Sequence, residues 1–505
     1  MPGTSSGLDL YVGHDLGTGG DKAALVDRQG RVLATAFEPY ELFHPAPKVA
    51  EQDPEDYWAA VSSTTRAVLD EAGVGAESVK AVGFAGQMLT LVPLDAGGVP
   101  TRMAISWMDS RADQEARRLV RRLGGDRVVM ALAGAVPSGK DIVCKVAWLR
   151  RNEPEVFDRT AAFCDATGYL VARATGELVA DHTAAGGTGL LNRKTREWDR
   201  LLTTVIRAPV KKLPRILACA DVVGGLLEGP ASELGLVPGT PVVAGLGDVP
   251  AAQVGSGSVL PGDAHICLGT SGWLCVTTDT AKDLGRNGVF SLPAADPSSF
   301  AMVGEMETVG ECLDWFVDNL GAGELTHATC LSEAAEVAPG CDGLMFLPWM
   351  FGERSPVTDT TLRGGFVNLS LDHGRGHLVR AMLEGAALNL RWVLDVVASA
   401  GHPCPRLRAI GGGSRSDLWL QTIADVTGRG IDAVSNAQSA GAVGAALTSA
   451  IGIGSLPGYA AVRPLASIDR SFEPDPGVAA LHGERFEAYR SMWPPMSRLG
   501  RRLNR

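Results

Sequence analysis

The sequence predicts an α/β fold of two domains, and three observations support this prediction. The chain has 505 residues, more than one hydrophobic core normally supports, so two domains of about 250 residues each are expected. An apolar run breaks into Leu-Gly-Thr at residues 16–18 and again at 268–270, so each half opens on the same turn. Strand patterns mixed with long helical patterns are typical of α/β domains. We place the division at residue 250, which gives domains 1–250 and 251–505 without a flexible linker.

The first repeated turn is predicted to be the tip of a hairpin. Residues 10–13 are expected to form a strand, residues 15–22 the turn and residues 23–26 the returning strand. Glycine lets a ligand approach the backbone, N–H groups can bind an anion, and threonine adds a hydroxyl donor. Residues 264–276 repeat the pattern. A single glycine-rich turn is more often only a turn, but the repeat favours a nucleotide site that holds a polyphosphate from both sides.

The other elements follow in chain order. A helix is predicted to start at Pro54, because proline suits the first helical turn. Further strands are predicted at residues 32–37, 79–84, 241–244 and 408–410, and further helices at residues 110–123, 145–151, 377–397 and 417–426. A small-residue helix at 440–446 could pack close behind the ligand site, or simply pack.

The composition excludes several classes of protein. A net charge of −11 and a pI of about 5.4 argue against nucleic acid or an anionic membrane as the partner. Nine cysteines without a Cys-x-x-Cys pair indicate reduced thiols in a cytoplasm. Residues 1–7 show no basic and apolar signal segment, and the uncharged stretch 433–462 is too rich in glycine, serine and proline to favour a membrane span. We expect a cytoplasmic enzyme.

Three charged residues are candidates for chemistry. Asp248 follows a buried-looking strand, and such a carboxylate could accept a hydroxyl proton as a phosphoryl group arrives. It could equally cap the helix that starts at Val249. Asp15, in the first turn, could hold Mg²⁺ through water, and Lys22 could neutralise phosphate charge. Asp is also common in turns, and a lysine that begins a strand is usually solvated.

A run of three glycines follows the predicted strand 408–410. Gly411, Gly412, Gly413 and Ser414 would let the flat face of adenine or ribose lie against the backbone. Such a triplet is more often only a loop, so this assignment depends on its neighbours.

Taken in this order, these segments resemble the FGGY family of carbohydrate kinases, and within it the xylulokinases most closely, over residues 9–450. The matching stretches are residues 13–26, 51–54, 86–88, 107–111, 247–248, 268–272, 346–348, 352–356, 363–391 and 411–428. The resemblance implies two ribonuclease-H-like domains of the actin and hexokinase type, with sugar and MgATP in the cleft between them.

The resemblance also implies roles for individual residues. Asp248 would be the catalytic base, and Asp15 with Asp248 would lie at the magnesium site. The nucleotide would contact Asp15, Gly17, Thr18, Gly19, Lys22, Gly269, Thr270, Ser271, Gly411, Gly412, Gly413 and Ser414. The sugar pocket would be formed by Gln87, Met88, Leu89, Trp107, Asp109, Asp248 and Val249, with core packing as the alternative for Met88 and Trp107.

Two positions depart from the xylulokinase pattern. Leu89 stands where those enzymes usually have histidine, and Val249 where they usually have asparagine. Losing groups that bond sugar hydroxyls can redirect specificity. We expect D-xylulose as acceptor, with ribulose, a deoxyketose or a short polyol such as erythritol as alternatives. A sugar sensor without catalysis is a third possibility, and a homodimer is possible.

Overall fold

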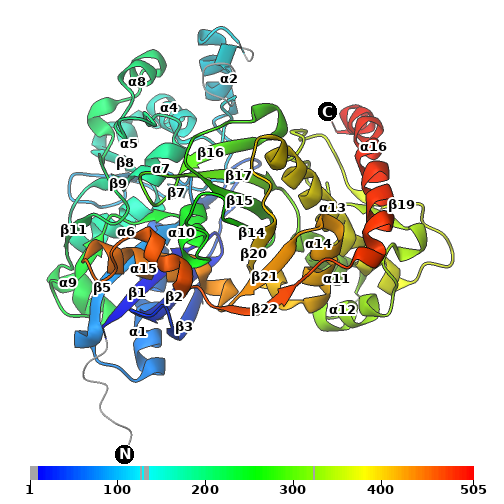
Figure 1. Cartoon of the computed structure of the whole chain (residues 1–505). Helices are drawn as coiled ribbons and strands as arrows, with labels where there is room; N and C mark the ends of the chain where they lie inside the picture. The colour runs from blue at the N-terminus through cyan, green and yellow to red at the C-terminus, as the bar shows by residue number, and fades with distance from the viewer. Residues whose placement is uncertain (1–8, 126–127, 130–135, 322, 324, 505) are drawn as a thin grey trace, which may run out of the picture. The chain divides into compact units, whose positions relative to one another are not determined.

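The computed structural model describes residues 9–504 apart from 126–127, 130–135, 322 and 324 (Figure 1). The chain forms two compact units, each built from three segments. Unit 1 is Met1–Val259, Leu292–Phe300 and Ser439–Ala466, and unit 2 is Leu260–Ser291, Ala301–Gln438 and Ser467–Arg505. The prediction of a single division at residue 250 does not include the two later segments, Leu292–Phe300 and Ser439–Ala466, that belong to unit 1. Residues 1–7, where the sequence predicts no signal segment, lie outside the described residues.

Unit 1 is built on a mixed sheet of seven strands. Its order is β11-β12-β5-β1-β2-β3, and β13 pairs with β5. The strands are β1 (Leu10–Leu16), β2 (Gly20–Asp27), β3 (Val32–Pro39), β5 (Val79–Gly86), β11 (Val222–Gly225), β12 (Pro241–Val243) and β13 (Leu246–Gly247). β1 and β2 pair antiparallel from Leu10↔Asp27 to Leu16↔Asp21, so the first predicted hairpin is confirmed. Its turn is shorter than the predicted 15–22, because Asp15 and Lys22 pair as strand residues.

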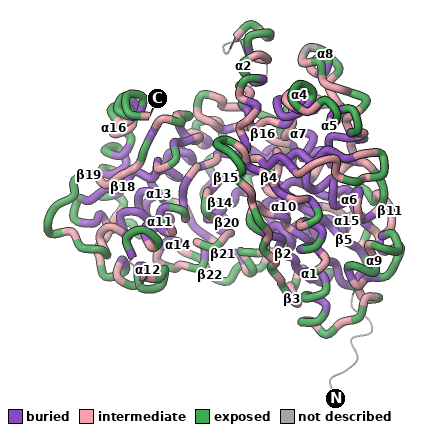
Figure 2. Tube along the Cα trace, turned by 180° about the vertical axis from the view of Figure 1, so that it is seen from behind, coloured by how far each residue is buried: buried purple, intermediate pink, exposed green. Residues whose placement is uncertain are grey.

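Helices cover both faces of this sheet, because consecutive residues of its central strands are apolar and buried, so both faces need to be covered. Leu10 and Val12 face a core formed with α1 (Pro54–Ala72) and α6 (Ala166–Thr175). Tyr11 faces a second core formed with α10 (Asp248–Gly255) and α15 (Ala440–Gly452). α1 begins as predicted, with Pro54 in its first turn and the Asp53 side chain accepting from the Glu55 amide. Figure 2 shows the central strands β5 and β14 as largely buried, whereas the edge strands β3 and β22 are partly exposed.

The small residues of α15 allow its backbone to touch the sheet. A Cβ added to Gly13 of β1 would lie 2.0 Å from the Ala442 carbonyl oxygen, and one on Gly83 of β5 would lie 2.2 Å from the Ala445 carbonyl oxygen. In Figure 1 the orange α15 therefore lies beside the dark-blue β1. The helix predicted at 440–446 exists and packs in unit 1, where Gly13 and Gly83 leave room for its backbone.

Unit 2 has a sheet of its own in the order β16-β17-β15-β14-β20-β21-β22. Its strands are β14 (Ala264–Leu268), β15 (Gly272–Thr278), β16 (Val289–Pro293), β17 (Phe300–Met306), β20 (Arg406–Ile410), β21 (Gly430–Val434) and β22 (Ile468–Phe472). The hairpin of β14 and β15 confirms the second predicted turn. The long apolar α13 (Arg375–Ser399) and α14 (Asp417–Thr427) form the core with this sheet, as their sequence patterns predict.

The remaining helices and strands complete the two units. The helices are α2 (Asp113–Arg122), α4 (Ile142–Asn152), α5 (Pro154–Arg159), α7 (His182–Gly187), α8 (Arg200–Ile206), α9 (Glu228–Leu234), α11 (Gly310–Leu320), α12 (His327–Ala335) and α16 (Ala479–Leu503). The strands are β4 (Glu51–Gln52), β6 (Val92–Leu94), β7 (Ala104–Ile105), β8 (Ala162–Cys164), β9 (Val179–Asp181), β10 (Arg215–Leu217), β18 (Met345–Leu347) and β19 (Gly365–Val367).

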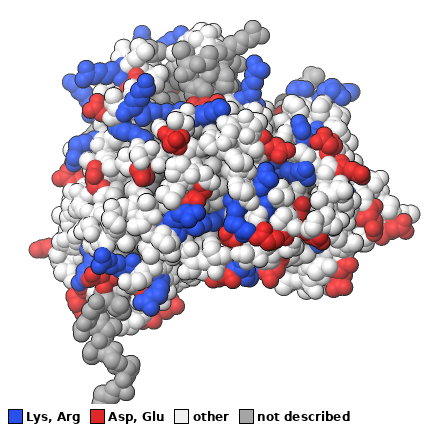
Figure 3. Space-filling view, viewed as in Figure 1, with Lys and Arg blue, Asp and Glu red and all other residues white. Residues whose placement is uncertain are grey.

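The surface and the cysteines agree with the composition. All nine cysteines are free and buried. Basic and acidic side chains are interspersed over the face in Figure 3. Within the described part of the chain, no helix is long and apolar enough to cross a membrane.

We predict that Gly13→Ala destabilises unit 1. The new methyl group would overlap the Ala442 carbonyl, and overpacking of this kind costs about 1–3 kcal/mol. Thermal unfolding followed by circular dichroism measures the loss as a lower midpoint. The matched control is Gly229→Ala, whose Cβ would meet nothing within 4 Å. Equal midpoints for the two variants would contradict the close packing of α15.

Candidate active site

Three parallel strands of unit 1 end side by side. Leu16 of β1 and Gly247 of β13 both pair with Gly86 of β5. Neighbouring strands lie about 4.8 Å apart, so the residues that follow these three positions emerge together at one edge of the sheet. They include Gln87 and Asp248. In open α/β sheets, ligands bind outside such carboxyl ends.

The first turn has its carbonyl groups turned into the protein. The carbonyl oxygen of Gly17 accepts from the Tyr40 hydroxyl, that of Thr18 from Gln52 Nε2 at 2.8 Å, and that of Gly19 from the Tyr40 amide at 3.3 Å. A trans peptide points its N–H opposite to its C=O. The amides that follow these carbonyls therefore face away from the protein interior, which is the orientation an anion requires.

A buried polar network joins this turn to the predicted sugar residues. Trp107 Nε1 donates to Thr18 Oγ1 at 2.8 Å, and the Thr18 hydroxyl lies 3.4 Å from Gln87 Oε1. Gln87 Nε2 and the Tyr57 hydroxyl both donate to Gln52 Oε1, at 2.7 and 2.8 Å. The structure thus brings together Thr18, Gln87 and Trp107. No role was predicted for Gln52 or Tyr57. The sequence feature that could point to them is a polar side-chain group within a segment that is otherwise buried.

The carboxylate of Asp109 is fully buried and used within the protein. It accepts from the Ala50 amide at 2.7 Å, from the Arg111 amide at 2.9 Å and from Arg111 Nε at 2.8 Å. Arg111 also pairs with Glu51 at 2.8 Å. Asp109 therefore supports the segment that carries Trp107.

The residues after Gln87 lie next to the start of α10. Met88 Sδ lies 2.7 Å from the point where a Cβ on Gly247 would be, and Met88 Cε lies 2.8 Å from the equivalent point on Gly187. Leu89 has a φ of 64°, a left-handed conformation that is rare for leucine. Val249 is buried, whereas Met88 and Leu89 are half-buried.

Asp15 is half-buried at the end of β1. Burial raises the pKa of its carboxyl, Lys22 across the hairpin opposes this rise, and Asp21 adds to it. The first helical residues of α15 approach it closely, because a Cβ on Gly441 would lie 2.3 Å from Asp15 Oδ2. The carboxylate is therefore fixed from behind, and Lys22 is exposed beside it.

The donor atoms present fit a magnesium ion that shares its ligands with phosphate. Among the described residues, no group of three His, Cys, Asp or Glu side chains is placed to hold a metal alone. Asp15 and Asp248 each offer carboxylate oxygens at the ends of strands in one sheet. Mg²⁺ commonly takes one or two carboxylates and completes its shell with water and phosphate oxygens.

Asp248 is the first residue of α10, and Gly247 occupies the N-cap position. The adjacent Val249 amide donates to Asp248 Oδ1 at 2.9 Å. Behind it, the Gly247 amide donates to Thr183 Oγ1 at 2.9 Å, and the Thr183 hydroxyl donates to Asp181. The carboxylate of Asp248 is thus held at the sheet edge by its backbone.

Two buried acids lie behind this backbone. Burial, the neighbouring charge of Asp181 and, to a smaller extent, that of Asp248 together raise the pKa of Asp165 to about 7. Burial also raises the pKa of Asp181. One oxygen of Asp165 accepts from the Gly168 amide at 2.8 Å. Neither acid was predicted from the sequence, where both precede helices and match ordinary N-caps.

The second turn, in unit 2, has the same orientation as the first. The carbonyl oxygens of Gly269 and Thr270 accept from the amides of residues 309–311 at the start of α11, at 2.9 to 3.1 Å. The amides of Thr270 and Ser271 therefore point away from α11. Thr270 is exposed, so its hydroxyl is open to a ligand.

The glycine triplet of unit 2 packs against this turn. A Cβ on Gly411, whose φ is 88°, would lie 2.8 Å from the Leu268 carbonyl oxygen, and one on Gly413 would lie 2.7 Å from the Trp419 ring. Ser414 is buried and donates its hydroxyl to the Gly411 carbonyl at 2.6 Å. Gly412 is exposed and Gly411 and Gly413 are half-buried, so Gly412 is the residue of the triplet most accessible to a ligand.

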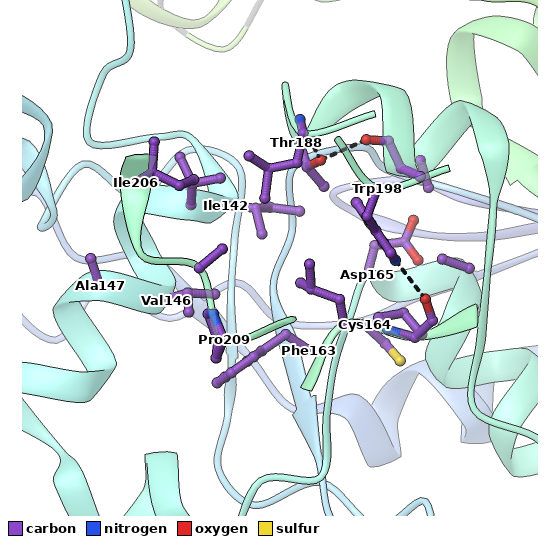
Figure 4. A pocket seen from close by; sticks show the side chains of 18 of the residues that line it. Ile142, Val146, Ala147, Phe163, Cys164, Asp165, Thr188, Trp198, Ile206 and Pro209 are labelled. Carbon is purple, nitrogen blue, oxygen red and sulfur yellow. Dashed lines mark hydrogen bonds between the residues drawn. The ribbon is translucent and has the colours of Figure 1, made fainter. Parts of the chain in front are cut away.

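A separate apolar pocket lies elsewhere in unit 1 (Figure 4). It encloses about 700 Å³ of empty space, part of it open to solvent, and none of the predicted site residues lines it. Trp198, Ile142 and Phe163 are among its lining side chains. It is therefore distinct from the sheet edge described above.

Comparison with known families matches most of the chain. The model of the N-terminal domain of the FGGY family of carbohydrate kinases matches residues 10–255, and that of its C-terminal domain matches residues 264–453. Each of the two matched ranges contains one of the two Leu-Gly-Thr turns.

Individual proteins are similar over almost the whole chain. The xylulose kinase of Escherichia coli is 32% identical over 485 residues, which cover 96% of this chain and 98% of that protein. The crystal structure of a xyloylose kinase from Brucella ovis has a TM-score of 0.88 at 29% identity, covering 97% of this chain and all of that one. The gluconate kinase of Lactobacillus acidophilus also has a TM-score of 0.88, at 25% identity, covering 97% and 98%.

We predict that Asp165 makes stability depend on pH. Its pKa in the folded state is about 7 against 3.8 in the unfolded chain, so the folded state binds the extra proton between these values and stability falls as pH rises through this window. Asp165→Asn keeps the cap of the Gly168 amide but carries no proton. Urea unfolding at pH 5 and pH 8 should show the wild type losing about 1–4 kcal/mol relative to this variant.

The matched control is Asp95→Asn, which alters an exposed turn carboxylate that also accepts backbone amides. The same pH dependence in the wild type and Asp165→Asn would contradict the raised pKa.

Proposed function

Because the chain belongs to the FGGY family of carbohydrate kinases, we propose that it transfers the γ-phosphoryl group of ATP to a terminal hydroxyl of a ketose, D-xylulose. It is a phosphotransferase with an alcohol group as acceptor. The observation that carries the proposal is the shared edge of β1, β5 and β13, where the first turn, Gln87 and Asp248 meet.

Asp248 is the proposed catalytic base. A half-buried carboxylate at the start of a helix can accept the acceptor's hydroxyl proton as the phosphoryl group approaches. Its backbone is fixed by Thr183, so its position does not need to be organised during the reaction. Gln87 and Trp107 would hold the sugar next to it.

The two turns would bind the phosphate groups. Their carbonyls are occupied from behind, so the amides after Gly17, Thr18, Gly19, Gly269 and Thr270 are oriented to stabilise negative charge. Lys22, exposed beside Asp15, adds a positive charge. Mg²⁺, held by Asp15 and Asp248, would neutralise phosphate charge when bound. Gly412 would lie at the adenosine end.

The choice of D-xylulose rests on the names of similar proteins. The Escherichia coli relative is a xylulose kinase, but the gluconate kinase of Lactobacillus acidophilus has the same TM-score as the Brucella ovis protein, so fold similarity does not separate acceptors. Leu89 and Val249, the two apolar departures, favour a second candidate function, which is the same transfer to ribulose, a deoxyketose or a short polyol. Xylose metabolism and a cytoplasmic location would follow from the first.

We predict that Asp248→Asn removes turnover and leaves nucleotide binding largely intact. Asparagine cannot accept the proton, and general-base catalysis contributes about 10²–10⁴-fold. ADP release with saturating D-xylulose measures turnover, and calorimetric titration with MgATP measures binding. Asp70→Asn, at an exposed helical position, is the control. Turnover by Asp248→Asn at the wild-type rate would refute the assignment, and silence of the wild type with every acceptor would favour a sensor.

We predict that Leu89 controls the acceptor. ADP release should be measured against D-xylulose, ribulose, deoxyketoses, erythritol, glycerol and gluconate. If D-xylulose is not the best acceptor, Leu89→His should raise its kcat/KM by about tenfold or more, because a hydroxyl regains a partner. Val249→Asn should raise the kcat/KM for D-xylulose less than Leu89→His does, since Val249 is buried. Leu371→His, at a fully exposed position, is the control. An unchanged acceptor profile in Leu89→His would contradict this prediction.

A further inference from the structure

Lys145 is a fully buried lysine that two backbone carbonyls hold. It lies on α4 with 0% of its surface exposed. Its Nζ donates to the Leu89 carbonyl oxygen at 2.8 Å and to the Ser106 carbonyl oxygen at 2.8 Å. Lysine is almost never buried unless it is paired. The two bonds therefore mark a position where the protein needs a donor.

The two carbonyls belong to the two segments of the proposed sugar pocket. Leu89 ends the segment that starts at Gln87, and Ser106 directly precedes Trp107. Two carbonyl oxygens that point at one buried site repel each other and lack water to bind. One ammonium group between them satisfies both and fixes the distance between the segments.

The bond to Leu89 acts on a strained backbone. The φ of 64° at Leu89 lies in the left-handed region, which leucine adopts only when its surroundings impose it. Met88, the residue before Leu89, packs against Gly187 and Gly247. The Lys145 bond therefore holds the backbone directly after Met88, whose side chain lies next to the residue before Asp248.

α4 is a firm base for this side chain. Ile142, Val146 and Leu149 of α4 pack in one apolar cluster with Leu91 and Ile105. Leu91 lies two residues after Leu89, and Ile105 directly precedes Ser106. Lys145 therefore reaches both segments from a helix already anchored to the strands that carry them.

The charges around Lys145 act at longer range. Burial lowers the pKa of Lys145 to about 7, Asp109 and Asp141 favour the charged form, and Arg111 and Lys140 oppose it. Either form of the amine has at least two N–H donors, so both bonds persist on either side of this pKa.

We propose that Lys145 is a positioning residue that holds Leu89 in its left-handed conformation and the Ser106–Trp107 segment beside it, and thereby sets the affinity for the acceptor sugar. This rests on the proposed function. Lys145 does not reach the reacting atoms, because its two bonds go to the backbone. Lys145 contacts the acceptor segments directly and reaches the first turn indirectly, through the bond from Trp107 to Thr18, so its removal acts mainly on the acceptor.

The test is Lys145→Met, which keeps an unbranched side chain and removes the donor. The KM for D-xylulose, or for the best acceptor of the panel, should rise about tenfold or more, while the KM for ATP changes less than about twofold. Lys145→Gln, which retains an N–H donor, should fall between the wild type and Lys145→Met, and it also serves if the methionine variant does not fold. Equal changes in both KM values, or none, would overturn the proposal.

The matched control is Lys80→Met. Lys80 is an exposed lysine that also donates to a backbone carbonyl, that of Glu77 at 2.9 Å. It should leave both KM values unchanged.

A double-mutant cycle tests the strain directly and needs no activity. Glycine adopts a positive φ without cost, so Leu89→Gly should reduce the drop in thermal unfolding midpoint caused by Lys145→Met. Additive midpoint changes would overturn the proposal even if the wild type phosphorylates D-xylulose. Non-additive midpoint changes, together with a wild type that phosphorylates none of the acceptors, would reject the proposed function. They would still support the role of the Lys145 bond in holding Leu89.

Discussion

The backbone contact between α15 and the sheet is the constraint on which the geometry of unit 1 depends. Gly13 and Gly83 admit the helix to within van der Waals distance of β1 and β5, and any larger side chain would overlap a carbonyl oxygen. The same helix starts at Gly441 against the Asp15 carboxylate and packs on α10, which begins with Asp248. One segment from late in the chain therefore lies against the Asp15 carboxylate and against the helix that Asp248 begins.

Electrostatics at this edge follows from where the carbonyl groups are used. In each unit, the turn after the first hairpin strand has its carbonyls bound from behind, by Tyr40 and Gln52 in unit 1 and by the start of α11 in unit 2. Because a peptide is planar and trans, the amides then face the opposite way. Oriented backbone amides can bind an anion without charged side chains, which is why glycine and threonine suffice for the proposed phosphate contacts of the two turns.

The sequence predicted what local patterns encode. Both hairpins, the start of α1 and the apolar α13 are where alternation, capping and periodicity place them, and the family followed from motifs in order. The return of α15 to unit 1 was missed because contact between distant segments leaves no local pattern. Lys145 also could not be assigned from the sequence. One charged residue in the apolar run Ile142–Leu149 indicates a buried lysine with a partner, but its partners are backbone carbonyls, which every residue has.

The central claim is that the edge formed by β1, β5 and β13 binds the reacting groups. A crystal structure with a non-hydrolysable ATP analogue, Mg²⁺ and D-xylulose tests it most directly. The account predicts phosphate oxygens on the amides that follow Gly17, Thr18, Gly269 and Thr270, and a terminal sugar hydroxyl within hydrogen-bond distance of Asp248. Phosphates bound away from both turns, or a sugar whose hydroxyls do not reach Asp248, would contradict it.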